Sequence, residues 1–113
     1  MIPLSPYRTY GELVFTSGQI GAAPDGSIPD DFEGQTRHAM DALRTQLEAA
    51  GASLATVFKT TVFITDAADF AEMNRLYVEY FSDPFPARST IITGLALPEL
   101  RFEIEAVAHR VEG

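Results

Sequence analysis

The clearest structural signal in this sequence is the run Phe102-Glu103-Ile104-Glu105-Ala106-Val107-Ala108, which continues into His109. Successive side chains of a strand point to opposite faces. The small and apolar members on one face are Phe102, Ile104, Ala106 and Ala108, and those on the other are Glu103, Glu105, Val107 and His109. The run therefore predicts a strand with one face in a packed core and a second face that carries two glutamates.

The residues before this run predict further strands and two helices. Strands are expected at 7–10, 13–19, 56–64, 88–93 and 102–110, because these stretches are rich in β-branched and aromatic residues and are bounded by turn signals such as Pro24-Asp25-Gly26-Ser27. Asp30 with Glu33 resembles a capping box for a first helix that ends at Gly51. Its apolar positions recur at helical spacing, and Glu33 can pair with Arg37.

A second helix is expected after Asp66 or Asp69, either of which can cap it. Its apolar positions are Phe70, Met73, Tyr77, Tyr80 and Phe81. The order of elements indicates an α+β fold, a mixed β-sheet with both helices packed on one face. At 113 residues, the chain 1–113 is expected to form one domain.

The central strand predicts a surface for self-association. Lys59, Thr61 and Phe63 alternate on one side, and Phe58, Thr60, Val62 and Ile64 on the other. Neither side is wholly polar, so the face of the sheet that the helices leave open is expected to be partly apolar.

Candidate chemistry begins with Arg88 in Phe85-Pro86-Ala87-Arg88-Ser89. Phe85 precedes a proline and is biased toward an extended conformation, which favours Arg88 at the start of a strand. A guanidinium can grip a carboxylate with two parallel hydrogen bonds. Together with the last strand, this run predicts Arg88 and Glu103 on neighbouring extended segments, where one cation and one carboxylate can hold a small acid beside an activated water.

The two glutamates of the last strand are about 7 Å apart by strand geometry. Mutual repulsion and partial burial can raise the pKa of one of them toward the range useful for acid/base work. The alternative is structural: both glutamates face solvent, or they pair with Arg88 and Arg101.

Composition narrows the classes of function. The formal net charge is −8, which argues against general binding to nucleic acids or anionic membranes. There is no cysteine, no N-terminal signal and no apolar run long enough to span a membrane, so the cytoplasm is the expected location. No Cys/His cluster has the spacing of transition-metal ligands, and no metal site is predicted.

Several motifs together resemble one known family. They are Ser5-Pro6-Tyr7, Leu13-Val14-Phe15-Thr16-Ser17-Gly18-Gln19-Ile20, Ala49-Ala50-Gly51-Ala52-Ser53-Leu54, Val57-Phe58-Lys59-Thr60-Thr61-Val62-Phe63-Ile64, Phe70-x-x-Met73-Asn74, Phe85-Pro86-Ala87-Arg88-Ser89 and Glu103-Ile104-Glu105-Ala106-Val107-Ala108. In this order they resemble the RidA/YjgF family of reactive-intermediate (enamine/imine) deaminases, over essentially the whole chain.

The resemblance implies a chorismate-mutase-like fold and a homotrimer with ligand sites between neighbouring subunits. It also implies a reaction: hydrolysis of enamines or imines of the 2-aminoacrylate type to 2-keto acids and ammonia, without a cofactor. By resemblance, Arg88 holds the substrate carboxylate and Glu103 activates the water. The positions that line or support the pocket are Tyr7, Ser17, Asn74 and the backbone around Gly18 and Thr90.

Two departures from the family pattern keep other functions open. The connection between Tyr7 and Ser17 is shorter than in many relatives, so Tyr10 is an alternative to Tyr7, and the loop at Ser82-Asp83-Pro84 is also contracted. One alternative function is a non-catalytic trimeric sensor that binds small 2-keto acids through Arg88. Another is the RNA-cleaving activity claimed for some relatives, which the acidic balance disfavours.

Overall fold

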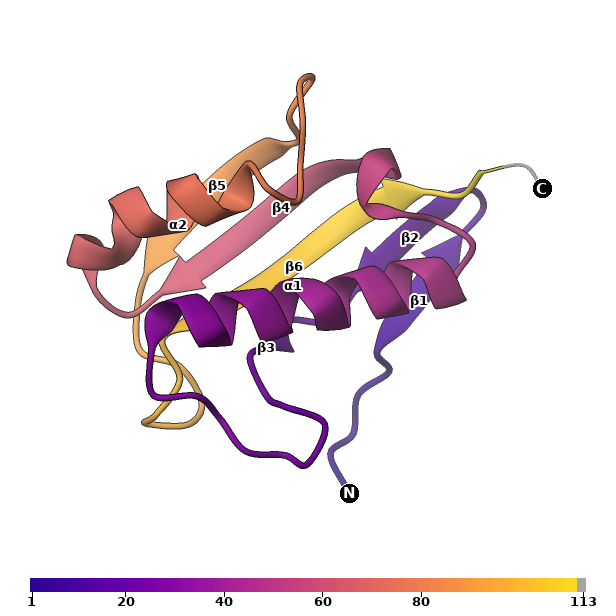
Figure 1. Ribbon diagram of the computed structural model, residues 1–113. Helices are drawn as coiled ribbons and strands as arrows, with labels where there is room; N and C mark the ends of the chain where they lie inside the picture. The colour runs from indigo at the N-terminus through magenta and orange to yellow at the C-terminus, as the bar shows by residue number, and fades with distance from the viewer. Residues whose placement is uncertain (112–113) are drawn as a thin grey trace.

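The computed structural model describes residues 1–111 and contains one sheet covered by two helices (Figure 1). The elements are β1 (Tyr7–Tyr10), β2 (Leu13–Thr16), β3 (Gln19–Ile20), α1 (Phe32–Ala49), η1 (Leu54–Thr56), β4 (Val57–Ile64), η2 (Ala67–Asp69), α2 (Phe70–Tyr77), β5 (Ala87–Ile92) and β6 (Phe102–His109). The main strand order is β1-β2-β6-β4-β5, and β3 pairs with β6 beyond the end of β2. The predicted α+β fold with a mixed sheet is confirmed.

Among residues 1–111, only one pair of strands in the sheet is parallel. β4 and β5 run in the same direction, with Thr60 opposite Arg88, because α2 connects them as a crossover. All other pairs are antiparallel, including β4 with β6, where Phe63 lies opposite Glu103. This topology makes β5 one edge of the sheet and β1 the other.

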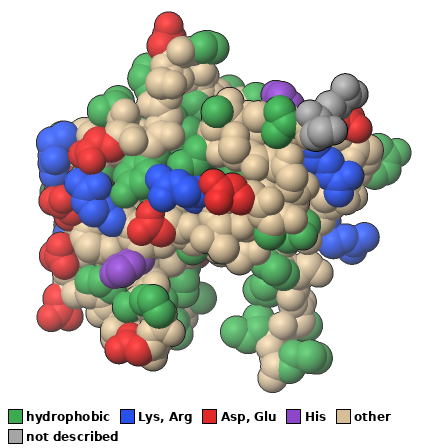
Figure 2. All heavy atoms as spheres, turned by 45° about the vertical axis from the view of Figure 1, so that its right-hand side comes forward, with side chains coloured by type: hydrophobic (Ala, Val, Ile, Leu, Met, Phe, Trp, Pro, Cys, Tyr) green, Lys and Arg blue, Asp and Glu red, His purple; other side chains and the backbone are tan. Residues whose placement is uncertain are grey.

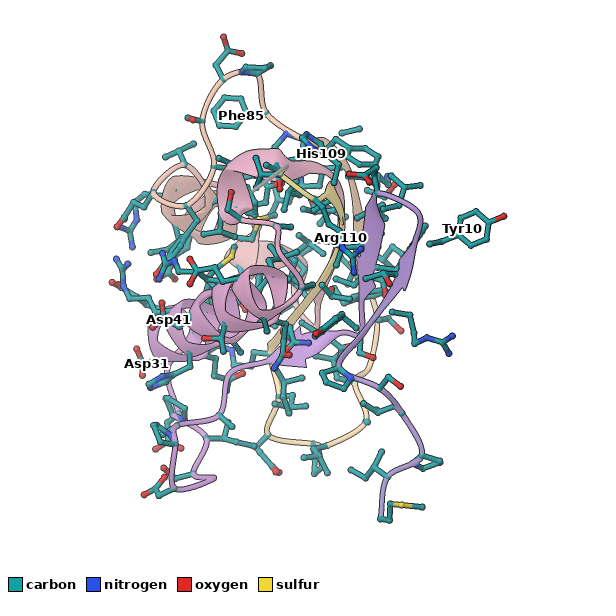
Figure 3. All side chains as sticks on the ribbon, turned by 90° about the vertical axis from the view of Figure 1, so that its right-hand side faces the viewer. Tyr10, Asp31, Asp41, Phe85, His109 and Arg110 are labelled. Atoms are coloured by element: carbon teal, nitrogen blue, oxygen red, sulfur yellow. The ribbon has the colours of Figure 1, made fainter. Side chains whose placement is uncertain are left out.

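Both helices cover the same face of the sheet, as the view in Figure 3 shows. The apolar face of β6 is buried against them, and Phe102, Ile104 and Ala108 are inaccessible to solvent. The core also contains the apolar stripe of α1, including Met40, Leu43 and Leu47. Among residues 1–111 no helix covers the opposite face of the sheet, and we call it the open face.

The buried Gln35 of α1 joins this helix to two loops. Its side-chain amide donates to the carbonyls of Pro29 and Glu99, both at 2.9 Å, and its Oε1 accepts from the backbone N–H of Arg101 at 2.8 Å. Gly21 packs beside it so closely that an added Cβ would overlap the Gln35 backbone. Such close packing fixes β3 against α1 and therefore fixes the start of β6.

Ion pairs join the outer surfaces of the two helices. Arg37 pairs with Glu33, as predicted from their spacing, and also with Glu79 beyond α2. Arg75 of α2 reaches Glu33 in turn, at 3.4 Å. In Figure 2, charged side chains of both signs lie next to one another on this part of the surface. No helix among residues 1–111 is long and apolar enough to cross a membrane.

The predicted start of the first helix is wrong by one residue. Asp31, rather than Asp30, is the N-cap, and its carboxylate accepts a hydrogen bond from the Gly34 N–H at 2.9 Å. Glu33 therefore occupies the second helical position, too early in the helix for a capping box. Asp30 and Asp31 have the same side chain, and the spacing of nearby residues did not show which of them is the N-cap.

The predicted second helix is too long. α2 ends at Tyr77, so Tyr80 and Phe81 follow the helix, although Phe81 is still buried in the core. Asp66 caps the short η2 turn, whereas Asp69 pairs with Arg101 at 2.9 Å. The apolar sequence pattern continues after the helix ends, because the residues that follow it are also packed against the core. The pattern therefore did not indicate where the helix ends.

Two strand predictions also need correction. The expected strand 13–19 is interrupted at Ser17 and Gly18, where the Thr16 hydroxyl accepts the hydrogen bond of the Ala106 N–H in place of a backbone carbonyl. Phe58 was assigned to the same side of the central strand as Thr60 and Val62, but an irregularity between Val57 and Lys59 turns it to the other side. It is 45% exposed and stacks on His109.

Candidate functional site

Arg88 lies on the helix-facing side of edge strand β5. It is opposite Thr60, which is buried and hydrogen-bonded to the Tyr77 hydroxyl at 2.8 Å. The Arg88 guanidinium carbon lies 4.9 Å from the centre of the Tyr77 ring and 5.8 Å from that of Phe70. The two aromatic rings hold the cation from the α2 side by cation–π attraction.

Within the described part of the chain, Arg88 makes no ion pair. Its Nη1 approaches the Met73 sulfur at 3.7 Å, a weak contact that leaves the charge uncompensated. A half-buried cation without a carboxylate partner attracts anions. The structural alternative, in which the two glutamates pair with Arg88, is therefore absent from residues 1–111.

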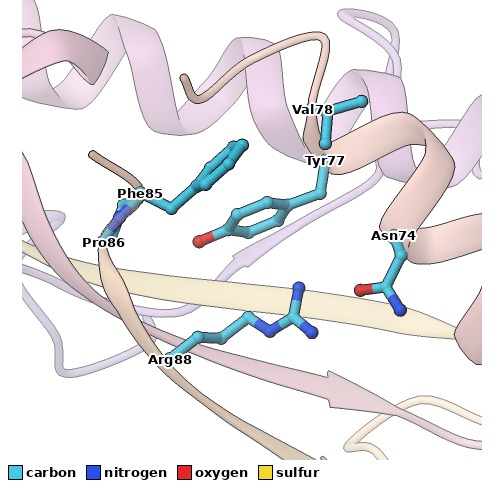
Figure 4. Close-up of a pocket in the computed structure, with 6 residues that line it drawn as sticks. All are labelled: Asn74, Tyr77, Val78, Phe85, Pro86 and Arg88. Carbon is cyan, nitrogen blue, oxygen red and sulfur yellow. The ribbon is translucent and has the colours of Figure 1, made fainter. Parts of the chain in front are cut away.

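A cavity of about 470 Å³ opens beside this guanidinium, and we call it the Arg88 cavity. Its lining residues are Asn74, Tyr77, Val78, Phe85, Pro86 and Arg88. In Figure 4 the Asn74 amide and the guanidinium lie on one side of the cavity and the Phe85 ring on the other. Arg88 and Asn74, both predicted site residues, thus share one cavity, which can take a carboxylate with an apolar substituent.

Glu103 lies elsewhere, on the open face. Its neighbours Phe102 and Ile104 face the core, and it is opposite Phe63 rather than a helix-facing residue. Burial, and secondarily the charge of Glu105, raises the pKa of Glu103 above its ordinary value. This agrees in direction with the expectation for the two glutamates, and it makes Glu103 a better base at neutral pH than an exposed glutamate.

Ser17 and Gly18 lie next to Glu103, at the break between β2 and β3. An added Cβ at Gly18 would overlap the Glu103 carboxylate, so only glycine leaves room for the side chain as it stands. The Ser17 N–H donates to the Pro6 carbonyl at 2.9 Å, and the Ser17 hydroxyl donates to Ser5. We call Ser17, Gly18 and Glu103 the glutamate cluster.

The structure does not bring Arg88 and Glu103 together within one chain. The expectation that their segments are neighbours is wrong, because β4 lies between β5 and β6. The two side chains also point to opposite faces of the sheet, since Thr60 faces the helices and Phe63 does not. One chain therefore carries a cation site and a carboxylate site that face different directions.

The remaining predicted residues are spread along the sheet. Thr90 is on the same face of β5 as Arg88, two residues further on. Tyr7 is on β1 at the far edge, where it packs against the core and its hydroxyl lies 3.4 Å from the Ala49 carbonyl. Tyr10, the alternative to Tyr7, is 81% exposed and points away from the body of the molecule (Figure 3).

Sequence reasoning missed four residues of the Arg88 cavity. Tyr77 and Val78 were interpreted as core or left unassigned, and Phe85-Pro86 served only to predict an extended backbone. A signal existed for Tyr77, because it lies three residues after Asn74 on the same helix and therefore on the same face. Among residues 1–111, no group of three or more potential ligand side chains could hold a metal ion.

Comparison with known proteins places this geometry in a family. The model of a family described as endoribonuclease L-PSP matches residues 2–110. The chain belongs to this family. The match confirms the resemblance to the RidA/YjgF family over nearly the whole sequence.

Individual relatives in this family carry deaminase names. The chain is 38% identical to the 2-iminobutanoate/2-iminopropanoate deaminase of Escherichia coli over 104 residues, which are 88% of this chain and 81% of that protein. Its fold matches the crystal structure of RidA from the Antarctic bacterium Psychrobacter sp. PAMC 21119, with a TM-score of 0.90 and 31% identity over 95% of this chain and 88% of the other. This likeness confirms the chorismate-mutase-like fold.

One related structure contains a small amino acid. Escherichia coli TdcF with bound serine matches with a TM-score of 0.89 and 37% identity, over 98% of this chain and 91% of the other. Serine carries a carboxylate, the group for which the Arg88 cavity is suited.

Proposed function

We propose that this chain hydrolyses reactive enamines and imines of the 2-aminoacrylate type to 2-keto acids and ammonia. The observation that carries the proposal is Arg88: a half-buried guanidinium without an ion-pair partner among the described residues, beside a cavity of about 470 Å³. The deaminase name of a relative at 38% identity supports the same reaction class.

In the proposed reaction, Arg88 grips the substrate carboxylate through two N–H donors. The enamine takes a proton at its terminal carbon and loses one from its nitrogen, which gives the imine, whose C=N carbon is electrophilic. Glu103 accepts a proton from a water as the water attacks that carbon. The same carboxyl group passes this proton to the imine nitrogen, which gives a carbinolamine. A second proton then moves from the carbinolamine hydroxyl to nitrogen, and the C–N bond breaks as the C=O bond forms, which releases ammonia and leaves the 2-keto acid.

We further propose that two copies of the chain complete each site. Arg88 and Glu103 face opposite sides of one sheet, so a single bound molecule cannot contact both within one chain. The open face supports association, because Phe15, Phe58 and Ile91 on it are each more than 40% exposed. A homotrimer in which the Arg88 cavity of one subunit faces the glutamate cluster of the next meets both requirements.

A non-catalytic binder of small 2-keto acids is the alternative. It is favoured by the fact that the Arg88 cavity needs no residue of the glutamate cluster to hold a carboxylate. An RNA-cleaving function gains little support, since the chain carries a formal net charge of −8.

One experiment distinguishes the enzyme from the binder. An enamine is generated in situ by a dehydratase acting on serine or threonine, and release of the keto acid is followed with and without the purified protein. Calorimetric titration with 2-ketobutyrate is run in parallel. Acceleration together with binding is expected; binding without acceleration would leave only the sensor, and absence of both would contradict the proposal.

A further inference from the structure

The walls of the Arg88 cavity differ sharply between its two sides. Arg88 is the one charged residue among the six that line it, and Asn74 supplies an amide. The Tyr77 hydroxyl is already bonded to Thr60 at 2.8 Å. The other lining residues, Val78, Phe85 and Pro86, offer only apolar side chains. A ligand that presents a carboxylate to Arg88 therefore meets hydrocarbon at its other end.

Exposed apolar side chains lie at and near the same cavity. Val78 is 58% exposed and Phe85 49%, and Phe70, whose ring lies 5.8 Å from the Arg88 guanidinium carbon, is 43% exposed. Figure 4 shows the Phe85 ring beside the Tyr77 ring, with Val78 adjacent. Clustered exposed apolar groups at the rim of a cavity are typical of a binding surface, because their exposure is costly in the free protein.

The size of the cavity points in the same direction. A volume of about 470 Å³ falls within the range of roughly 300–1,000 Å³ that holds drug-sized ligands. A keto acid with only a methyl or ethyl substituent would leave the side formed by Val78 and Phe85 in contact with water. A larger apolar substituent would displace that water and bury both surfaces.

We infer that the preferred substrates are 2-imino acids with a branched aliphatic or aromatic side chain, which lies against Val78 and Phe85 while Arg88 holds the carboxylate. The inference rests on the proposed deaminase function and names its substrate class. Each methylene fully removed from water changes affinity by about fourfold. Side chains with several additional carbons should therefore bind at least about tenfold more tightly than a methyl group.

The test compares products of increasing side-chain size. Dissociation constants are measured by calorimetry for pyruvate, 2-ketobutyrate, 2-keto-4-methylpentanoate and phenylpyruvate. Imines generated in situ by an amino-acid oxidase from alanine, leucine and phenylalanine give the corresponding kcat/KM values. We expect both affinity and kcat/KM to rise with side-chain size, by about tenfold or more between alanine and leucine products.

Variants at Val78 and Phe85 test whether these two residues cause the preference for large side chains. Val78→Ser and Phe85→Ser should each weaken 2-keto-4-methylpentanoate and phenylpyruvate several-fold more than they weaken pyruvate. Val111→Ser is the matched control, because Val111 is 59% exposed and lies outside the cavity. It should change none of these ratios.

The outcomes separate this inference from the function on which it rests. If pyruvate binds and its imine is hydrolysed as well as the larger compounds, the inference is wrong and the deaminase proposal stands. If larger acids bind more tightly and no imine is hydrolysed, Val78 and Phe85 select ligands with large side chains, and the deaminase proposal fails. If no acid binds and no imine is hydrolysed, both fail.

Discussion

Arg88 is held in place by aromatic rings rather than by a carboxylate, and this determines what its removal should do. Arg88→Ala should weaken 2-keto-acid binding by at least about 100-fold, because two charge-assisted hydrogen bonds are lost. Turnover should be lost as well. Arg88→Lys should rescue little, because an ammonium cannot reproduce the planar fork. Calorimetry and the enamine assay measure both effects.

The fold of Arg88→Ala should persist, because the cation–π contacts of this half-buried guanidinium with Tyr77 and Phe70 contribute only about 1–2 kcal/mol. Arg44→Ala is a suitable control: its guanidinium also lies over a ring, that of Tyr80, at 5.6 Å, but it pairs with Asp41 outside the cavity. Near-normal turnover in Arg88→Ala would remove Arg88 from the site.

A substitution of Glu103 distinguishes the proposed enzyme from the alternative, a non-catalytic sensor. Glu103→Gln keeps the shape of the side chain and loses the base, so turnover should fall by roughly 10²- to 10⁴-fold while 2-keto-acid binding largely persists. Glu105→Gln on the same strand face is the control and should cost far less. Equal small effects of the two substitutions would favour the sensor. A larger loss of turnover in Glu105→Gln would assign the role of the base to Glu105, two residues further along the strand.

The raised pKa of Glu103 also predicts how stability depends on pH. Because the folded-state pKa lies above the unfolded value, folding favours the protonated form, and this contribution is lost as pH rises through the folded pKa. Glu103→Gln should thus have a higher Tm than the wild type at pH 7. The difference should vanish below about pH 3, where the wild-type carboxyl is protonated in both states. A Tm difference independent of pH would contradict this assignment.

At the scale of the elements, the break between β2 and β3 depends on two glycines with different neighbours. Gly18→Ala should displace the Glu103 side chain, a flexible neighbour, and so reduce turnover about tenfold or more with little loss of stability. Gly21→Ala meets the Gln35 backbone, which cannot move without shifting α1. It should destabilise the fold by about 1–3 kcal/mol.

Chemical denaturation and the enamine assay, run on both glycine variants, check this contrast. If Gly18→Ala retains full turnover, the Glu103 carboxylate does not need its position against the glycine. If Gly21→Ala unfolds at the wild-type denaturant concentration, the close packing of β3 on α1 contributes little to stability.

The same elements show what the sequence could and could not predict. Alternation in β6 correctly assigned the core face and the glutamate face, because a period of two follows from strand geometry. The order of the strands was not predicted. A strand, a helix and a strand in succession favour a parallel pair, which here is β4 with β5. β4 therefore lies between Arg88 on β5 and Glu103 on β6. The outward turn of Phe58 had no local signal, since the β-branched and aromatic pattern continues through it.

The candidate site was predicted unevenly for a related reason. Arg88 and Asn74 were found through motif resemblance, and they do line one cavity. Val78 and Phe85 were not, because an apolar residue at a cavity rim has the same sequence pattern as one in the core. Their exposure became evident only from the packing of α2 on the sheet.

At the scale of the whole molecule, the proposed site would need a second copy of the chain, because Arg88 and Glu103 lie on opposite faces of one sheet. Sedimentation equilibrium should give a trimer at micromolar concentration. Co-expression of Arg88→Ala with Glu103→Gln should restore about a quarter of wild-type turnover, since each site then draws its two residues independently from a mixed trimer. Each variant alone should remain inactive.

A monomer would remove the shared site and leave Arg88 to act alone. An inactive mixture of trimers would mean that Arg88 and Glu103 act from the same chain. Exchange of subunits can be verified by mass spectrometry of the mixed trimers, which separates a failure of mixing from a failure of complementation.

The hydrogen bonds from Ser17 to Ser5 and Pro6 tie the first residues of the chain to the glutamate cluster. This N-terminal arm otherwise stands away from the body, with Ile2 and Leu4 exposed (Figures 1 and 2). Trimming the arm would free the Ser17 N–H and hydroxyl beside Gly18. An affinity tag or fusion partner placed ahead of Met1 would disturb the same hydrogen bonds. Loss of activity in a tagged or shortened protein would then result from displacement of Ser17 and Gly18, and it would not show that the catalytic residues were assigned wrongly.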